Sequence, residues 1–186
     1  YVEDSGSQLI LNRVIISNNM AGNGAGIFNN GTMTLTDVVI TSNGDVAVTS
    51  EGGGIYNKNS STLNRVTIYA NEADDGGGIH NDDTASNISL TNVTVSGNTA
   101  AGFGGGLANQ APATIVNSTF TLNNANNGGC IDNCDSIDMT NTILSGNTAN
   151  STNDDVIGAI TSQGYNLIGN TSGISGLVAS DITGVS

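Results

Sequence analysis

The chain repeats itself with a period of 24 residues, and this period constrains its fold more than any other feature. Each repeat opens with an apolar residue and carries an asparagine eight positions later. A second apolar residue and the next opening residue follow at further steps of eight in the regular repeats. The opening residues are Leu11, Leu35, Leu63, Leu90, Ile115 and Met139, and the second apolar residues are Ile27, Ile55, Ile79, Leu107 and Ile131. A fixed period in this range is typical of a solenoid, in which each repeat forms one coil.

The pattern inside one repeat predicts three short strands separated by corners. Apolar and polar residues alternate over Ile88–Leu90 and over Val93–Val95, as they do along a half-buried strand, and a third strand places Gly105, Leu107 and Asn109 on one face. Parallel strands stack about 4.8 Å apart, and parallel connections are right-handed. We therefore predict an all-β fold, a right-handed parallel β-helix with six to seven triangular rungs. A leucine-rich-repeat horseshoe has a similar period, but glycine triplets and β-branched residues occupy the places where it needs a helix.

The repeat also predicts the domain organisation. We expect one β-helix domain over residues 1–186, with regular rungs at about 9–147 and an irregular terminal rung at about 148–170. The chain begins almost directly in a repeat, so we expect it to be a fragment of a longer protein.

Two columns of asparagine recur at fixed places in the repeat. We interpret them as internal ladders, in which each amide bonds the amides above and below and satisfies corner backbone groups. Ligand binding by these residues is the alternative. The first column is Asn19, Asn43, Asn71, Asn98, Asn123 and Asn147, and the second is Asn29, Asn57, Asn81, Asn109 and Asn133. A third column consists of small residues, and we infer that a narrow coil leaves no room there for a side chain: Ala25, Gly53, Gly77, Gly105 and Gly129.

The charge of the chain limits its partners. Three basic residues stand against 16 acidic ones, for a net charge of −13. Such a surface repels nucleic acid and anionic membranes, since binding to phosphate depends on lysine and arginine. No run of about 18 apolar residues is present, so we expect no membrane insertion by this segment.

Departures from the period locate insertions, which lie outside the coil of a solenoid and often form its binding face. The largest insertions fall within residues 44–51 and 82–87. Binding candidates in the first loop are Gly44, Asp45 and Glu51. A second group is the outward column Phe28, Tyr56 and His80, which either covers a face with stacked rings or forms a small platform for a sugar ring.

Acidic pairs in turns are the candidate metal ligands. Asp74, Asp75, Asp82 and Asp83 could hold Ca²⁺ together with neighbouring carbonyl groups. The two pairs flank one strand from opposite ends, so we expect them not to share an ion. Structural Ca²⁺ is the one cofactor that the sequence leaves open.

The two cysteines are four residues apart. Cys130 and Cys134 form a disulfide only if the corner between them folds the chain back, because a bridge needs Cα atoms within about 7 Å. A free pair and a local disulfide both stay open at this point.

Parallel β-helices also host polysaccharide lyases and hydrolases, which need clustered carboxylates and, in lyases, a basic residue. The basic residues and the histidine are Arg13, Lys58, Arg65 and His80. Arg13 and Arg65 share one column with Asp37, which we interpret as a charge ladder of little energetic value. No catalytic constellation emerges, so we predict that the chain is not an enzyme.

Several motifs resemble those of a known family. The segments Gly24–Ile27, Gly52–Ile55, Gly76–Ile79, Gly104–Leu107 and Gly128–Ile131 resemble the Gly-Gly-apolar signature of polymorphic outer-membrane-protein repeats. An apolar residue three positions before each first-column asparagine matches the paired signature. Residues Ser162–Gly169 are similar to the closing element of large secreted bacterial β-helix proteins. The resemblance implies a bacterial protein that is extracellular or on the cell surface, with cell-surface or matrix components, including glycans, as partners.

Three functional hypotheses follow. The first is a non-catalytic extracellular β-helical scaffold or adhesin-like passenger segment. The second is a self-assembling subunit of an extracellular filament, because open strand edges at the ends of a coil allow head-to-tail association. The third is a polysaccharide-active β-helix enzyme.

Overall fold

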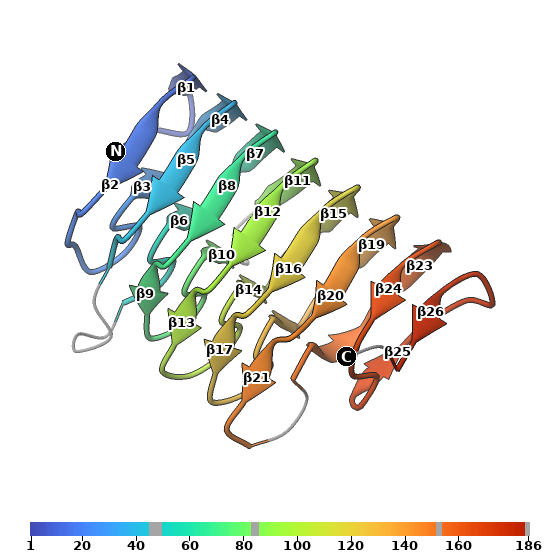
Figure 1. Cartoon of the computed structure of the whole chain (residues 1–186). Helices are drawn as coiled ribbons and strands as arrows, with labels where there is room; N and C mark the ends of the chain where they lie inside the picture. Colours follow the sequence, from blue (N-terminus) through green and yellow to red (C-terminus); the bar gives the residue numbers. More distant parts are fainter. Residues whose placement is uncertain (45–49, 83–85, 152–153, 185–186) are drawn as a thin grey trace.

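A computed structural model describes residues 1–44, 50–82, 86–151 and 154–184. In this part of the chain the regular structure consists of strands, two to five residues long, that pair in parallel. The coils stack side by side from the N-terminal end to the C-terminal end, as Figure 1 shows. The molecule is a parallel β-helix, as predicted. Among the described residues, no helix long and apolar enough to cross a membrane is present.

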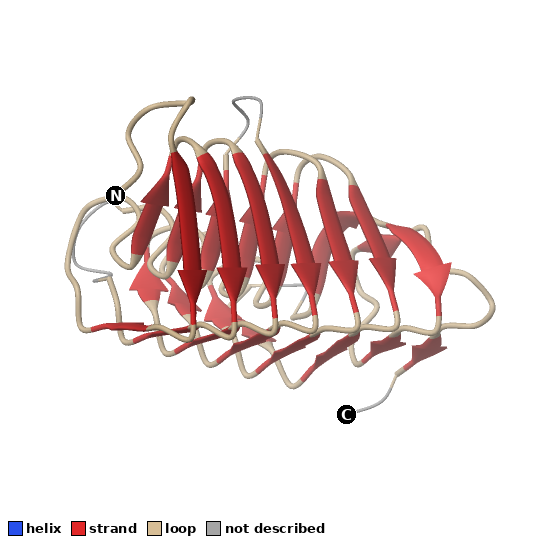
Figure 2. Cartoon of the chain, turned by 90° about the horizontal axis from the view of Figure 1, so that it is seen from above, coloured by secondary structure: helices blue, strands red, loops and turns tan. Residues whose placement is uncertain are grey.

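Three sheets form the main faces, and successive coils add strands to each (Figure 2). The first sheet contains β1 (Gln8–Asn12), β4 (Thr32–Thr36), β7 (Ser60–Asn64), β11 (Asn87–Thr91), β15 (Ala113–Val116), β19 (Ile137–Thr140) and β23 (Thr161–Gly164). The second contains β2 (Ile15–Ser17), β5 (Val39–Thr41), β8 (Thr67–Tyr69), β12 (Thr94–Ser96), β16 (Thr119–Thr121), β20 (Ile143–Ser145), β24 (Leu167–Ile168) and β26 (Ile182–Thr183). The third contains β3 (Ile27–Asn29), β6 (Ile55–Asn57), β10 (Ile79–Asn81), β14 (Leu107–Asn109), β18 (Ile131–Asn133), β22 (Val156–Ala159) and β25 (Ile174–Ser175).

A fourth, narrow sheet was not predicted. It consists of β9 (Glu72–Ala73), β13 (Thr99–Ala100), β17 (Asn124–Ala125) and β21 (Thr148–Ala149). It explains the column of small residues, because a Cβ atom added to Gly77 would lie 2.3 Å from the carbonyl oxygen of Thr99. At Gly105 the corresponding distance to Asn124 O is 2.4 Å. The close backbone of the fourth sheet therefore excludes a side chain at these positions.

Large apolar side chains fill the interior in columns that follow the pairing register. Leu35 pairs with Leu63, and Leu63 pairs with Leu90, all without solvent exposure. Full burial of one such side chain contributes roughly 1.5–3 kcal/mol relative to exposure. The other members of the core include Ile40, Ile68, Val95, Ile115, Phe120, Met139 and Leu144.

Asparagine side chains join the coils, as predicted. The Nδ2 atom of Asn71 donates to Oδ1 of Asn98 at 3.0 Å, and the backbone N–H of Asn71 donates to the same oxygen at 3.0 Å. In the second ladder Asn81 Nδ2 donates to Asn109 Oδ1 at 2.8 Å. The amide-to-amide bond runs from Asn19 to Asn147 through the whole first column and from Asn29 to Asn133 through the second.

Each ladder has a direction, with Nδ2 of one coil donating to Oδ1 of the next. The last donor of the first ladder is Asn147 Nδ2, which donates to Oδ1 of the buried Asp155 at 2.7 Å. The last donor of the second ladder, on Asn133, meets the backbone oxygens of Asp135 and Ala159 at 2.9 and 2.6 Å. Acceptors thus satisfy both ladders at the C-terminal end.

The strand pairing continues past residue 170, where the sequence shows no clear pattern. The strand β26 pairs with β24, and β25 pairs with β22. The C-terminal residues therefore extend two of the three main sheets.

We predict that Asn98→Ala lowers the free energy of unfolding by roughly 2–4 kcal/mol. The substitution leaves the buried backbone N–H of Asn71 without its acceptor, and an unsatisfied buried group costs about 1–3 kcal/mol. Urea denaturation measures the change. Asn126→Ala is the control, since Asn126 is exposed and a surface substitution stays within about 0.5 kcal/mol. Equal stability of the two variants would contradict a structural ladder.

Candidate functional site

The corner between the first and second sheets presents one residue per coil in left-handed backbone conformation. This conformation suits asparagine and glycine and is unfavourable for other residues. The side chains at this corner are exposed. In chain order the residues and their φ angles are Arg13 (56°), Asp37 (55°), Arg65 (54°), Asn92 (56°), Asn117 (51°), Asn141 (49°) and Tyr165 (62°). We call this set the corner column.

The N-terminal half of the corner column carries an ion pair. Arg65 Nε lies 2.6 Å from Asp37 Oδ1, and Arg65 Nη2 donates to Asp37 Oδ2 at 3.0 Å. The hydrogen bond from Arg65 holds the pKa of Asp37 below its ordinary value. Both side chains are well exposed, so the pair adds little stability. This is the predicted charge ladder, formed by Arg65 and Asp37.

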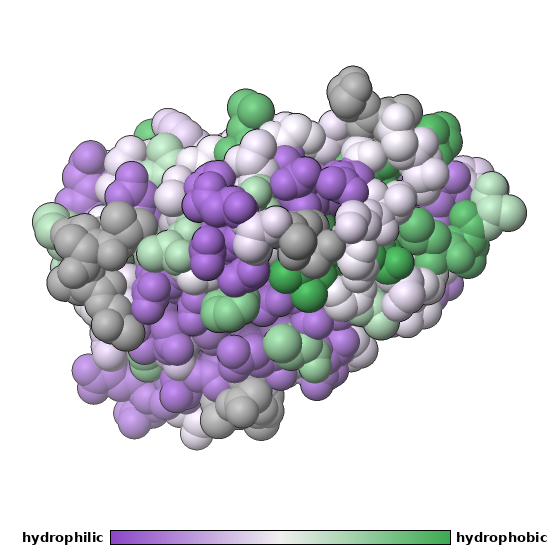
Figure 3. Space-filling view, turned by 90° about the horizontal axis from the view of Figure 1, so that it is seen from below, coloured by the Kyte–Doolittle hydropathy of each residue, from purple (hydrophilic) through white to green (hydrophobic). Residues whose placement is uncertain are grey.

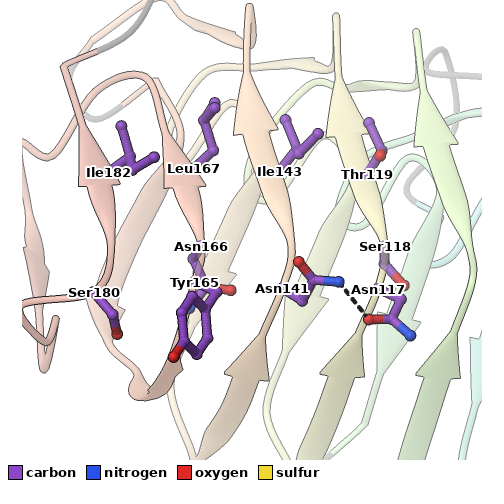
Figure 4. A pocket seen from close by; sticks show the side chains of 10 residues that line it. All are labelled: Asn117, Ser118, Thr119, Asn141, Ile143, Tyr165, Asn166, Leu167, Ser180 and Ile182. Carbon is purple, nitrogen blue, oxygen red and sulfur yellow. Dashed lines mark hydrogen bonds between the residues drawn. The ribbon is translucent and has the colours of Figure 1, made fainter.

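The C-terminal half of the corner column borders a groove with a volume of about 420 Å³. The groove lies across β16, β20, β24 and β26 and the corners before them (Figure 4). We call it the corner groove. Its lining residues are Asn117, Ser118, Thr119, Asn141, Ile143, Tyr165, Asn166, Leu167, Ser180 and Ile182. The volume falls within the range of sites for small ligands.

Two rows of side chains form the corner groove. In Figure 4 one row contains Asn117, Asn141, Tyr165 and Ser180, and the other contains Thr119, Ile143, Leu167 and Ile182. Asn141 Nδ2 donates to Asn117 Oδ1 at 2.7 Å. Within the described chain, Asn117 Nδ2 and Asn141 Oδ1 have no further hydrogen-bond partner, which leaves one donor and one acceptor for a ligand.

A buried polar chain supports the floor of the corner groove. Ser118 N donates to Thr142 Oγ1 at 3.4 Å, and Thr142 N donates to Asn166 Oδ1 at 3.0 Å. Asn166 Nδ2 then donates to Asp181 Oδ1 at 3.0 Å. The first three of these residues are at most 2% exposed. These bonds fix the corner on which the groove residues stand.

Tyr165 is the unusual residue of the corner groove. Its side chain is 74% exposed, and its φ angle of 62° places it in the left-handed region. A non-glycine residue held there costs about 1–3 kcal/mol, and such strain is concentrated at functional sites. An exposed ring gains little burial energy that would offset this cost.

The predicted column of rings forms, but most of it is buried. The ring centroids of Phe28 and Tyr56 lie 5.3 Å apart, and those of Tyr56 and His80 lie 5.2 Å apart. Tyr1 stacks on Phe28 at 4.5 Å. The expectation of an outward column is wrong for Tyr56 and His80, which are 5% and 2% exposed. A sugar platform would have only Tyr1 and Phe28 at the surface.

One carboxylate explains part of this burial. The Tyr56 hydroxyl donates to Asp82 Oδ2, and Lys58 Nζ lies 3.4 Å from the same oxygen. Burial and the Asp82 carboxylate raise the pKa of Tyr56 above its ordinary value. Lys58 also lies over the Tyr56 ring, 5.6 Å from its centroid. Asp82, expected as a metal ligand, is thus engaged by protein groups.

The other metal candidates lie apart from a common centre. Asp75 Oδ1 accepts a hydrogen bond from Phe103 N at 2.8 Å, and Asp74 N donates to Ser50 O at 2.9 Å. Asp83 lies outside the described residues. Among the described residues, no group of three or more histidine, cysteine, aspartate or glutamate side chains is arranged to hold a metal ion.

The ends of the first predicted loop are anchored to neighbouring coils. Gly44 N donates to Asn19 O at 2.9 Å, and Glu51 Oε2 accepts from Asn23 Nδ2 at 3.0 Å. Asp45 lies outside the described residues. A shallow cavity of about 360 Å³ borders this region, lined by Ser42, Asn43, Gly44, Ala70 and Glu72.

Cys130 and Cys134 are free thiols. Cys130 is buried in the core, whereas Cys134 is exposed and its Sγ atom lies 3.9 Å from Asp132 Oδ2. The possible disulfide is therefore not formed, because the two side chains lie in different environments, one inside the coil and one on its surface.

Sequence reasoning missed the corner groove. The positions of Asn117 and Asn141, two residues after the opening residue of each repeat, continue the column of Arg13, Asp37 and Arg65. That count would have found both asparagines. The same period leads from Asn141 to Tyr165, 24 residues later, but no apolar opening residue marks that repeat, because Gln163 stands two positions before Tyr165.

Comparison of the chain with protein-family models, with curated proteins and with solved structures finds no match.

We predict that Asp181 makes stability at the groove end dependent on pH. Burial alone would raise the pKa of Asp181, but hydrogen bonds from Val178, Asn166 and Ser162 outweigh it and lower the pKa. A carboxyl group with a lowered pKa in the folded state stabilises the fold above its unfolded pKa of about 3.9, and this contribution is lost as the pH falls through the folded value. The difference in Tm between the wild type and Asp181→Asn should therefore be constant from about pH 5 to 8 and shrink below about pH 4.

The control for this prediction is Asp138→Asn, an exposed aspartate on β19. Its Tm should follow that of the wild type at each pH. A Tm difference for Asp181→Asn that is unchanged between pH 7 and pH 3 would show that the carboxylate has no special role.

We predict that one thiol per chain reacts in the native state. Cys134 is exposed, whereas burial raises the pKa of the Cys130 thiol well above its ordinary value and shields it from reagents. Titration with Ellman's reagent should give one thiol in buffer and a second in urea, and Cys134→Ser should abolish the native reaction. No reactive thiol in urea without reductant would indicate a disulfide.

Proposed function

We propose that this chain is a non-catalytic extracellular β-helical scaffold, an adhesin-like segment that holds binding surfaces on a rigid rod. The observation that carries the proposal is the pair of asparagine ladders. Asn71 and Asn98, for example, are fully buried, and Asn71 Nδ2 donates a hydrogen bond to Asn98 Oδ1 in the next coil. Buried, fully bonded polar networks fix one arrangement of the chain. A rod held in this way keeps its outer faces in constant relative positions.

The outer faces supply the surface that such a scaffold displays. Figure 3 shows one face on which hydrophilic residues cover much of the area and hydrophobic residues gather toward the C-terminal side. The net charge of −13 supports solubility in an exposed setting and disfavours anionic partners. The resemblance to polymorphic outer-membrane-protein repeats, which rests on the sequence motifs alone, supports the proposal of a location on a bacterial surface.

A filament subunit is the second candidate, favoured by the N-terminal end of the rod. Among the described strands, β1 and β2 each have a neighbour on one side only, whereas Val2 forms a parallel bridge with Asn29 on the edge of β3. The core side chains of Leu9, Leu11, Val14 and Ile16 are only partly buried there. Open strand edges next to apolar side chains pair readily with another chain. At the opposite end β23, β25 and β26 likewise have a main-sheet neighbour on one side only.

The test uses the purified chain at several concentrations. Light scattering and negative-stain microscopy should show short single rods, and incubation with neutral and acidic glycans, with and without Ca²⁺, should yield no product. Fibres that lengthen with concentration would favour the filament. Any glycan product would contradict a non-catalytic scaffold and revive the polysaccharide-active enzyme.

A further inference from the structure

We infer that the corner groove is a binding site for a neutral oligosaccharide. The inference rests on the proposed function, since it names the ligand class that this scaffold would hold. Four observations carry it: the absence of charge in the groove, the exposed strained ring, the unused amide groups, and the change of two residue columns at successive coils.

The corner groove is uncharged although the protein is strongly acidic. Its ten lining residues are asparagine, serine, threonine, tyrosine, isoleucine and leucine. An anion would find no basic side chain among them, and a cation no carboxylate. A neutral ligand rich in hydroxyl groups matches a lining of amides, hydroxyls and apolar side chains.

Tyr165 supplies a flat apolar surface with a polar edge. Its ring is 74% exposed and stands in the same row as the two asparagines (Figure 4). The C–H face of a pyranose ring packs on such an aromatic surface, while the tyrosine hydroxyl reaches a hydroxyl group of the sugar. This use of the ring explains why an aromatic residue occupies a backbone position that suits asparagine better.

The two asparagines supply directional hydrogen bonds beside the ring. Asn141 donates to Asn117 at 2.7 Å, and this bond orients both amide planes. Asn117 Nδ2 and Asn141 Oδ1 can then bond an acceptor and a donor on adjacent sugar hydroxyls. Coils stack about 4.8 Å apart, so the row from Asn117 to Tyr165 spans about 10 Å. This length suits two or three linked rings.

Two columns change character at successive coils. In β8, β12 and β16 the first outward residue is Thr67, Thr94 or Thr119, whereas β20 and β24 carry Ile143 and Leu167 there. Ile182 of β26 continues the apolar row. The corner column changes one coil later, from Asn141 before β20 to Tyr165 before β24. The exposed apolar row forms one side of the groove, and Tyr165 with the two asparagine amides forms the other, more polar side. A pyranose ring likewise has an apolar side and a polar side.

The experiment titrates the protein with cellotriose, chitotriose, maltotriose and mannotriose, and with trigalacturonate as an anionic comparison. NMR follows the side-chain amides of Asn117 and Asn141 and the ring of Tyr165, and calorimetry gives the affinity. At least one neutral trisaccharide should shift these signals. Tyr165→Asn should weaken its binding at least about tenfold, and Asn141→Ala several-fold. Tyr165→Phe should retain most of the affinity.

Leu122→Asn is the matched control. Leu122 is an exposed apolar residue with a φ angle of 57°, like Tyr165, but it does not line the groove. Both asparagine substitutions relieve left-handed strain, so neither should lower the Tm. Loss of binding in Tyr165→Asn with a retained Tm would exclude misfolding as the cause. Leu122→Asn should bind the trisaccharide within about twofold of the wild type.

Two results would overturn the inference. One is the absence of binding by any neutral trisaccharide, and the other is binding that Tyr165→Asn leaves unchanged. Neither result would contradict the proposed scaffold function, which is tested by rod formation and by the absence of glycan turnover. Conversely, cleavage of a bound trisaccharide would leave the groove assignment intact and contradict the non-catalytic role.

Discussion

The hydrogen bond between asparagine amides of successive coils is the interaction on which the rest of this structure depends. Asn98 Oδ1 accepts from both the side chain and the backbone of Asn71, and Asn98 Nδ2 donates to Asn123. A buried amide without partners is costly, at about 1–3 kcal/mol for each unsatisfied group. Each coil therefore requires an asparagine at the same place in the next. This requirement explains why extra residues fall between the ladders and never shift an asparagine out of its column.

The direction of the ladders also decides how the rod can end. A chain of amides that passes its donor forward needs an acceptor after the last member, and a carboxylate accepts without donating. Asp155 fills this role after Asn147, and Asp181 fills it after Asn166 in the shorter corner chain. Part of the acidic composition is thus explained by the closure of hydrogen-bond networks. Carboxylates in these places also bring the segment of β25 and β26 against the last coils.

The columns of the fold follow directly from counting residues, because stacked coils place equivalent residues in register. The same counting could not find β9 and its neighbours, since two-residue strands carry no alternation. The alternation within the strands predicted that the Tyr56 and His80 side chains point outward. In the structure Asp82, which follows the strand β10, packs over Tyr56. The corner groove was missed because no apolar opening residue marks the repeat that contains Tyr165, and because Ile182 lies outside the repeat.

Strain alone does not identify a site in this molecule. Leu122 and Tyr165 are both exposed, both have a largely apolar side chain, and both have φ angles near 60°. Leu122 has glycine residues as its equivalents in the neighbouring coils, Gly97 and Gly146, and it does not line the corner groove. Tyr165 faces two amides with unused hydrogen-bonding groups and an apolar row. The two residues differ in their surroundings. Ligand binding is therefore inferred from the corner groove as a whole, and the strained backbone of Tyr165 supports it only together with the neighbouring groove residues.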